Sequence, residues 1–203
     1  MRVRSALVAT LAAGLLLSGL ASAVDSPNVK RLGATIAQFT DEVFQLAVSW
    51  KYTQVHPEER WTFFETWMMP KGKTPVSINR EDVSLFLPDG TRLPLPSQNR
   101  LNKDYPDMRR AVTVGNVVRD PMEGYFTTRN GLLRIGFQEV PGTFITYDER
   151  GIAPNWAAAG DLFFENPKGK WEPGIYTLSV KNKEVDASLP MPIGIKGDLE
   201  RVK

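Results

Sequence analysis

Short runs in which apolar and polar residues alternate constrain the fold of this chain more than any other feature of its sequence. In the longest run, residues 43–55, every second position from Phe44 to Tyr52 carries a large apolar side chain. A period of two buries one face of a β-strand. A second run at 60–69 follows the polar break at 56–59, so the two predict a long hairpin whose aromatic residues face the core.

Further alternating runs are separated by Pro- and Gly-rich turns, such as Pro88-Asp89-Gly90. The polar interval 97–120 has apolar residues at helical spacing from Leu101 to Val112 despite Pro106, which predicts a loop insertion with one short helix. Eight or nine short strands without regular helices between them predict an all-β antiparallel sandwich in a single domain, residues 24–203. Strands are expected at 82–87, 91–95, 132–138, 143–147, 161–165, 174–180 and 191–195.

The segment 25–40 fits two structures. Ser26 and Pro27 suit the start of a helix with Val29, Leu32 and Ile36 on one face. The stretch 34–40 also fits a first strand, which we favour, although the sequence alone leaves both open.

The stretch 171–180, WEPGIYTLSV, resembles the late strand of many immunoglobulin-like domains, in which a Pro-Gly turn precedes alternating Tyr and aliphatic residues. This resemblance implies an immunoglobulin-like sandwich. It implies no function, because one such fold carries many unrelated activities.

Residues 1–23 have the pattern of a secretory signal peptide. Arg2 and Arg4 precede an apolar stretch from Ala6 to Leu20, and Ala21-Ser22-Ala23 is a small-x-small cleavage site. We therefore expect a periplasmic or extracellular protein that begins at Val24. After position 23 we expect no membrane-spanning segment, because no apolar run approaches the roughly 20 residues that one needs.

Composition excludes several chemistries. The chain has no Cys, so it has neither disulfides nor a thiolate nucleophile or ligand. Cleavage at position 23 removes two of the 25 basic side chains and leaves 23 of each sign. A neutral chain attracts polyphosphate weakly, so we expect no nucleic acid partner. We expect no cofactor and no metal site.

His56 is the single histidine, and any histidine-dependent catalysis would need it. It stands beside Pro57 in a turn followed by Glu58 and Glu59, which is typical of a solvent-exposed hairpin tip. A catalytic base needs an orienting partner in a cleft. We therefore assign no catalytic residue.

Binding candidates come from carboxylates and aromatic rings. Glu65 lies between Phe63 and Trp67 on the side that reads as inward, where burial would raise its pKa, unless the strand twists it into solvent. Planar rings stack on sugars and anchor interfaces, but hairpin rings also fit the core. Trp156, in a predicted loop of small residues at 151–160, either closes the end of the core or contacts a partner. The candidate binding residues are Trp61, Trp67, Trp156 and Glu65.

Two functional hypotheses follow. The first is an exported, non-enzymatic domain that binds an envelope or secreted protein or a surface polysaccharide. The alternative is a carbohydrate-binding or carbohydrate-cleaving module that uses the aromatic hairpin and Glu65, because glycoside cleavage needs only two carboxyl groups. Exposure of Trp61, Trp67 and Trp156 beside Glu65 would favour the alternative.

Overall fold

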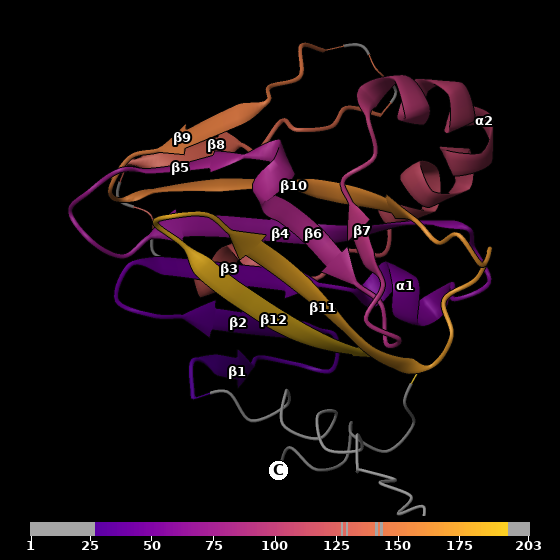
Figure 1. Cartoon of the computed structure of the whole chain (residues 1–203), viewed down its shortest axis with the longest axis horizontal. Helices are drawn as coiled ribbons and strands as arrows, with labels where there is room; N and C mark the ends of the chain where they lie inside the picture. Colours follow the sequence, from indigo (N-terminus) through magenta and orange to yellow (C-terminus); the bar gives the residue numbers. More distant parts are fainter. Residues whose placement is uncertain (1–26, 127, 129, 141, 143, 195–203) are drawn as a thin grey trace, which may run out of the picture.

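The computed structural model describes residues 27–194 except 127, 129, 141 and 143. This part of the chain forms twelve strands, two α-helices and two 3-10 helices, arranged mainly as two packed sheets (Figure 1). The all-β sandwich expected from the sequence is confirmed, with more strands than expected. None of the described helices is long and apolar enough to cross a membrane. The predicted signal peptide and its cleavage site lie outside the described residues.

The larger sheet has six strands in the order β1-β2-β3-β4-β10-β8. All neighbours are antiparallel except β10 and β8, which run parallel. The favoured strand within 34–40 is present as β2, and β3 pairs with β4 as the predicted hairpin requires. The strands are β1 (Val29–Arg31), β2 (Ile36–Thr40), β3 (Phe44–Ser49), β4 (Trp61–Pro70), β8 (Gly131–Arg134) and β10 (Trp156–Glu165).

The smaller sheet is antiparallel, in the order β12-β11-β6-β7, and it crosses one face of the larger sheet (Figure 1). The predicted turn at Gly90, with φ of 83°, joins β6 to β7. A separate two-stranded sheet pairs β5 with β9. These strands are β5 (Val76–Asn79), β6 (Val83–Phe86), β7 (Arg92–Pro94), β9 (Glu149–Ile152), β11 (Gly174–Lys181) and β12 (Asp186–Ile193).

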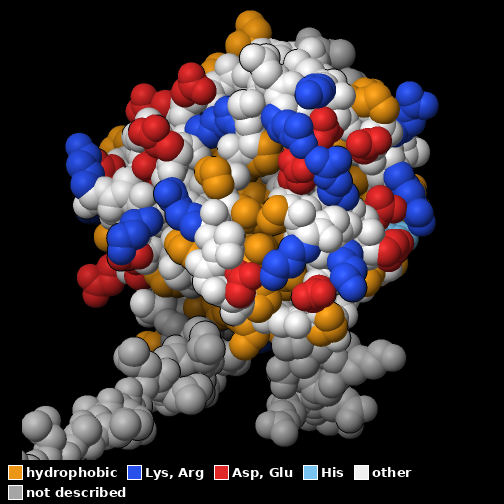
Figure 2. All heavy atoms as spheres, turned by 45° about the vertical axis from the view of Figure 1, so that its right-hand side comes forward, with side chains coloured by type: hydrophobic (Ala, Val, Ile, Leu, Met, Phe, Trp, Pro, Cys, Tyr) orange, Lys and Arg blue, Asp and Glu red, His pale blue; other side chains and the backbone are white. Residues whose placement is uncertain are grey.

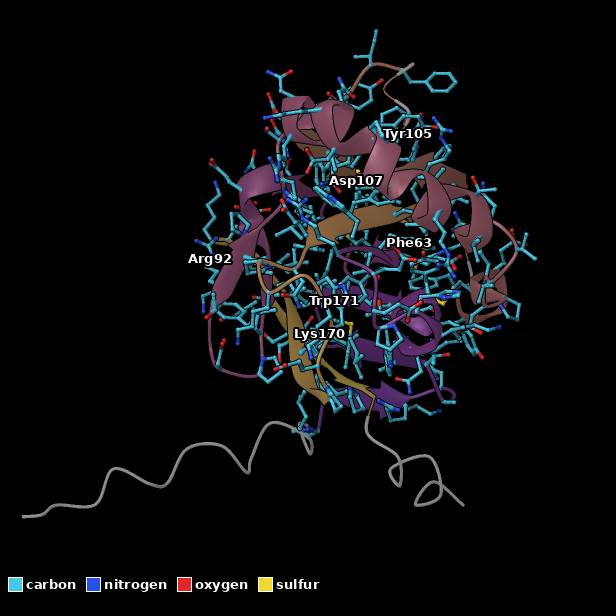
Figure 3. All side chains as sticks on the ribbon, turned by 90° about the vertical axis from the view of Figure 1, so that its right-hand side faces the viewer. Phe63, Arg92, Tyr105, Asp107, Lys170 and Trp171 are labelled. Atoms are coloured by element: carbon cyan, nitrogen blue, oxygen red, sulfur yellow. The ribbon has the colours of Figure 1, made fainter. Side chains whose placement is uncertain are left out.

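One hydrophobic core fills the space between the two sheets. Leu46 and Phe64 from the larger sheet pack with Leu178 and Leu189 from the smaller one. Trp171 enters this core beside Tyr176, and Figure 3 shows it between the sheets at one end of the sandwich. Burial of this apolar area is the main force that holds the layers together.

The predicted strand 43–55 ends early. Strand β3 stops at Ser49, and Lys51–Val55 form the short helix α1. The change of structure breaks the expected alternation: Trp50 stays in the inter-sheet core, whereas Tyr52 turns to the opposite side and stacks on Phe63. A hydrogen bond of 2.6 Å between the buried hydroxyls of Thr53 and Thr62 holds α1 against β4.

The interval 97–120 contains a helix of 18 residues, α2 (Gln98–Gly115), rather than the short helix expected. The Ser97 hydroxyl accepts a hydrogen bond from the Arg100 amide and caps its start. Pro106 lies inside it, tolerated because burial of one apolar face holds the helix. Leu101 and Met108 pack on the outer face of the larger sheet, and Figure 3 shows Phe63 beneath the helix.

An ionic network fixes α2 to the sheet. Glu165, at the end of β10, pairs with both Arg60 and Arg100, and Arg100 also contacts Asp104 at 2.9 Å. Burial by itself would raise the pKa of Glu165, but the hydrogen bonds from Arg100 and Arg60 outweigh it and hold the pKa below its usual value. The position of α2 is therefore set by charge as well as by apolar packing.

The inward phase predicted for β4 is wrong. Phe64 and Met68 face the inter-sheet core, whereas Trp61, Phe63 and Trp67 face outward. These outward aromatic residues are nevertheless buried, because α2 and the segment after it cover them. The larger sheet is thus covered on both faces, which a simple two-layer sandwich does not require.

Two other strand predictions need correction. The predicted strand 132–138 ends at Arg134, although Ile135 and Phe137 are buried as expected. The described residues of 143–147 form no strand, and the next strand is β9; Thr143 lies outside the described residues. Phe144 and Ile145 are 67% and 81% exposed, so their apolar pattern does not reflect burial.

We predict that Trp50→Ala lowers the free energy of unfolding by roughly 3–5 kcal/mol, because the ring is completely buried between the sheets. Urea denaturation of the folded protein measures the change. Val55→Ala, at a position 53% exposed, is the control and should cost at most about 0.5 kcal/mol. A loss under about 1 kcal/mol for Trp50→Ala would contradict the core position of this ring.

Candidate functional site

A row of polar side chains crosses the outer face of the larger sheet. Ser49 of β3 lies opposite Glu65 of β4, and Glu65 lies opposite Asp161 of β10. Residues opposite each other on antiparallel strands point to the same face. Apolar pairs flank this row along the strands, Phe63 with Phe163 on one side and Trp67 with Ala159 on the other.

The segment after α2 places a cation and an anion on this row. Arg119 donates to both carboxylate oxygens of Asp161, at 2.9 and 2.7 Å. Asp120 accepts hydrogen bonds from Ser49 at 2.7 Å and from Thr35 at 2.8 Å. These contacts connect the segment to β3, to β10 and to Thr35, the residue before β2. The hydrogen bond to Asp161 raises the pKa of Arg119.

Within this row, Glu65 has the fewest hydrogen-bond and ionic contacts to its carboxyl group. Its side chain is 14% exposed, and its closest cation, Arg119, is 3.9 Å away. Among the described residues no hydrogen bond reaches its carboxyl group. The pKa of Glu65 is raised to about 7, chiefly by burial; Arg119 opposes this rise, whereas Asp161, Asp120 and Glu123 contribute to it. A raised pKa in a cleft is typical of functional carboxyl groups.

Glu65 opens into a pocket of about 340 Å³. The floor is formed by β4 and β10, and the walls by the end of α2 and residues 134–140. Three aromatic side chains and five charged side chains line it, namely Phe63, Trp67, Phe163, Glu65, Arg119, Arg134, Glu139 and Asp161. Asn116 and Gln138 add amide groups, so the pocket combines aromatic surface with both signs of charge.

An ion pair forms one rim of the pocket. Arg134 contacts Glu139, whose side chain is only 9% exposed. The Arg134 guanidinium also lies 5.2 Å from the centre of the exposed Phe144 ring. Figure 2 shows acidic and basic side chains interspersed over one face of the molecule.

The structure brings together only two of the four candidate binding residues. Glu65 and Trp67 both line the pocket, but Trp67 is 7% exposed and stacks on Phe126, with ring centres 5.2 Å apart. Trp61 is 1% exposed beneath α2. The loop predicted at 151–160 is wrong, because β9 and β10 occupy most of it; Trp156 begins β10 and packs, partly buried, against the inter-sheet core on the opposite face.

Sequence reasoning missed Arg119, Arg134 and Glu139. Asp161 and Glu165 lie on one face of β10, as their spacing of four along a strand predicts. No local pattern marks Arg119, because it follows a helix in a polar interval. Arg134 and Glu139 lie within and after the predicted strand 132–138, and nothing in the sequence aligns either of them with Glu65.

His56 does not line the pocket. Its side chain is 16% exposed, its ring lies 5.0 Å from that of Tyr52, and its Nδ1 is 3.5 Å from Glu58. The expected solvent-exposed position is therefore wrong, because α1 folds the ring back onto Tyr52. In the described part of the chain, no group of three or more His, Asp or Glu residues is placed to hold a metal ion.

Comparison with known proteins found no matching family model, no similar curated protein and no similar solved structure.

We predict that Glu65→Gln stabilises the protein above pH 7 by about 1–2 kcal/mol, allowing for partial solvent screening. Folding raises the Glu65 pKa from 4.5 to about 7. Between these values the native state holds a proton that the unfolded chain has released, so stability falls as pH rises through this window. Urea denaturation of both proteins at pH 4, 6 and 8 measures the difference.

At pH 4 both states of the wild type are largely protonated, so the difference between wild type and Glu65→Gln should nearly vanish. Glu184→Gln, at an exposed glutamate, is the control and should follow the wild type at every pH. A constant difference across the range would mean that Glu65 titrates alike in the folded and unfolded chain.

Proposed function

We propose that the protein is an exported, non-enzymatic binding domain that holds a polar unit of an envelope polymer or of another protein in the Glu65 pocket. The supporting observation is the Glu65 carboxyl group, which is largely buried and opens into the pocket without a hydrogen-bond donor from the described residues. Burial disfavours the ionised form of this carboxyl group, which no described donor compensates by a hydrogen bond. A ligand that donates to Glu65 supplies that hydrogen bond.

The size and rim of the pocket favour a small unit of a larger molecule. A volume of about 340 Å³ is at the lower end of the roughly 300–1,000 Å³ typical of small-molecule sites. Outside it, Phe144 exposes apolar surface next to the Arg134 rim, and the following residue, Ile145, is also exposed. The pocket suits one polar group, and the rim offers contact area for the rest of the molecule.

Binding is favoured over catalysis because the second carboxyl group is engaged. Both oxygens of Asp161 accept hydrogen bonds from Arg119. A carbohydrate-cleaving role remains the alternative, since Glu65 and Asp161 are cross-strand neighbours and the Glu65 pKa of about 7 suits a general acid. The stacking part of that alternative loses support, because Trp61 and Trp67 are buried.

The immunoglobulin-like relationship is also a proposal. In its favour, the Tyr176 hydroxyl donates to the Glu172 carbonyl at 2.9 Å, an arrangement similar to the tyrosine corner of such domains. The parallel pairing of β8 with β10 departs from an all-antiparallel sandwich. The proposed relationship concerns fold and carries no ligand with it.

Export has its own prediction. N-terminal sequencing of the protein recovered from the periplasm or medium should begin at Val24, because the small-x-small site ends at Ala23. Folded protein that retains Met1 in the cytoplasm would contradict export.

For the pocket, we predict that the folded protein co-sediments with an insoluble envelope polymer, and that Glu65→Gln weakens this binding tenfold or more. The probes are isolated peptidoglycan sacculi, chitin and cellulose, each titrated at neutral pH. Glu184→Gln removes the same charge at a position outside the pocket. This variant should bind the polymer as the wild type does.

Two results would count against this proposal. Equal sedimentation of the wild type and both variants, or sedimentation of none, contradicts polymer binding through the pocket. Release of reducing sugar by the wild type, lost in Glu65→Gln, would instead support the carbohydrate-cleaving alternative.

A further inference from the structure

The charges in the pocket leave one carboxylate without a cation of its own. Arg119 is held by Asp161 through two hydrogen bonds, and Arg134 pairs with Glu139. Glu65 is left with Arg119 at 3.9 Å, a distance beyond hydrogen bonding. Three carboxylates and two guanidiniums line the pocket, so it carries a single uncompensated negative charge when Glu65 is ionised.

We propose that the group recognised by the pocket is a primary ammonium, a monocation on a small polar scaffold, seated against Glu65. This inference rests on the proposed function and specifies its ligand. An ammonium supplies the missing charge and three hydrogen-bond donors, and Glu65 is an acceptor when ionised. Such charge-assisted bonds are about twice as strong as neutral ones.

The aromatic lining also suits a cation. Phe63 and Trp67 stand on either side of Glu65 along β4, and Phe163 lies opposite Phe63. The Arg119 guanidinium already lies 5.5 Å from the centre of the Phe63 ring. Ring faces attract cations, most strongly where water is excluded. A partly enclosed pocket with aromatic rings in its floor is therefore favourable to a small organic cation.

Other ligand classes fit less well. An anion would place a second negative charge beside Glu65, and a neutral hydroxyl would leave the carboxylate charge uncompensated. A divalent metal needs several carboxylates, but Asp161 and Glu139 are each engaged by an arginine. A single organic cation matches the charge left in the pocket.

Ammonium binding should depend on pH, because it needs Glu65 ionised. Burial raises the pKa of Glu65 to about 7, so the carboxylate is lost as pH falls below that value. The titratable or charged groups that face it come from the strand β10, the segment after α2, the 3-10 helix η2 (Met122–Tyr125) and the rim. They are Asp161, Arg119, Asp120, Glu123, Arg134 and Glu139.

The experiment is calorimetric titration of the folded protein with two amines and their neutral counterparts. Nα-acetyl-lysine amide is compared with its Nε-acetylated form, and glucosamine with N-acetylglucosamine. The first pair represents a peptide source of the ammonium and the second an amino sugar. Titrations are run at pH 7 and 5.5 with wild type, Glu65→Gln and Glu184→Gln.

We expect at least one amine to bind tenfold or more tightly than its acetylated form at pH 7. That preference should disappear in Glu65→Gln, persist in Glu184→Gln, and fall about tenfold at pH 5.5. The pair of compounds that shows this preference indicates whether the ammonium belongs to a peptide or to an amino sugar. Circular dichroism of each variant confirms folding, which Glu65→Gln should retain because it removes a buried charge.

Equal affinity for an amine and its acetylated form, no saturation by any probe, or a preference retained in Glu65→Gln would each overturn the ammonium proposal. The polymer assay separates this failure from failure of the proposed function. Glu65-dependent sedimentation without any amine preference keeps the pocket as a binding site and removes only the ammonium as its ligand.

Discussion

Burial of β4 and β10 on both faces is the constraint on which the rest of this structure depends. Along β4, Phe64 packs into the inter-sheet core and Phe63 into the cluster beneath α2. Along β10, Phe164 and Phe163 divide in the same way. Two apolar faces need two covers. The smaller sheet supplies one cover, and α2 with the segment after it supplies the other.

The second cover passes over a polar row, and this is the origin of the pocket. Residues from Gln98 to Gly115 cover aromatic side chains, and a Cβ at Gly115 would collide with the Phe63 ring, so the helix ends in close contact with the sheet. The chain then crosses Ser49, Glu65 and Asp161, where it has to satisfy polar groups. Arg119 donates to Asp161, and Asp120 accepts from Ser49. Glu65 receives no such hydrogen bond, and burial destabilises its ionised form.

The buried Glu65 carboxyl group lowers the stability of the native protein, and a binding role explains why it is present. Burial without a hydrogen-bond donor destabilises the native protein above pH 7, and a glutamine at position 65 would avoid that penalty. Proteins commonly lose stability at sites that act on ligands. The proposed role for Glu65 gives this loss a function, since a bound cation would restore the missing interaction.

The sequence alone determined the sandwich, the hairpin of β3 with β4, the turn at Gly90 and the position of a helix within 97–120. Period-two alternation and turn residues are local signals, and they survive in the folded chain. The same alternation marked Trp61, Phe63 and Trp67 as buried, although it placed them on the wrong face. A period of two identifies two faces of a strand but not which partner covers each.

Only the tertiary structure decided the site. Glu65 was a candidate from its apolar neighbours, but its relation to Asp161 depends on a register between strands almost a hundred residues apart. Arg119 reaches them because α2 has a particular length and docking position. Pairing register and helix docking arise from the sum of many long-range contacts, so no local pattern in the sequence records them.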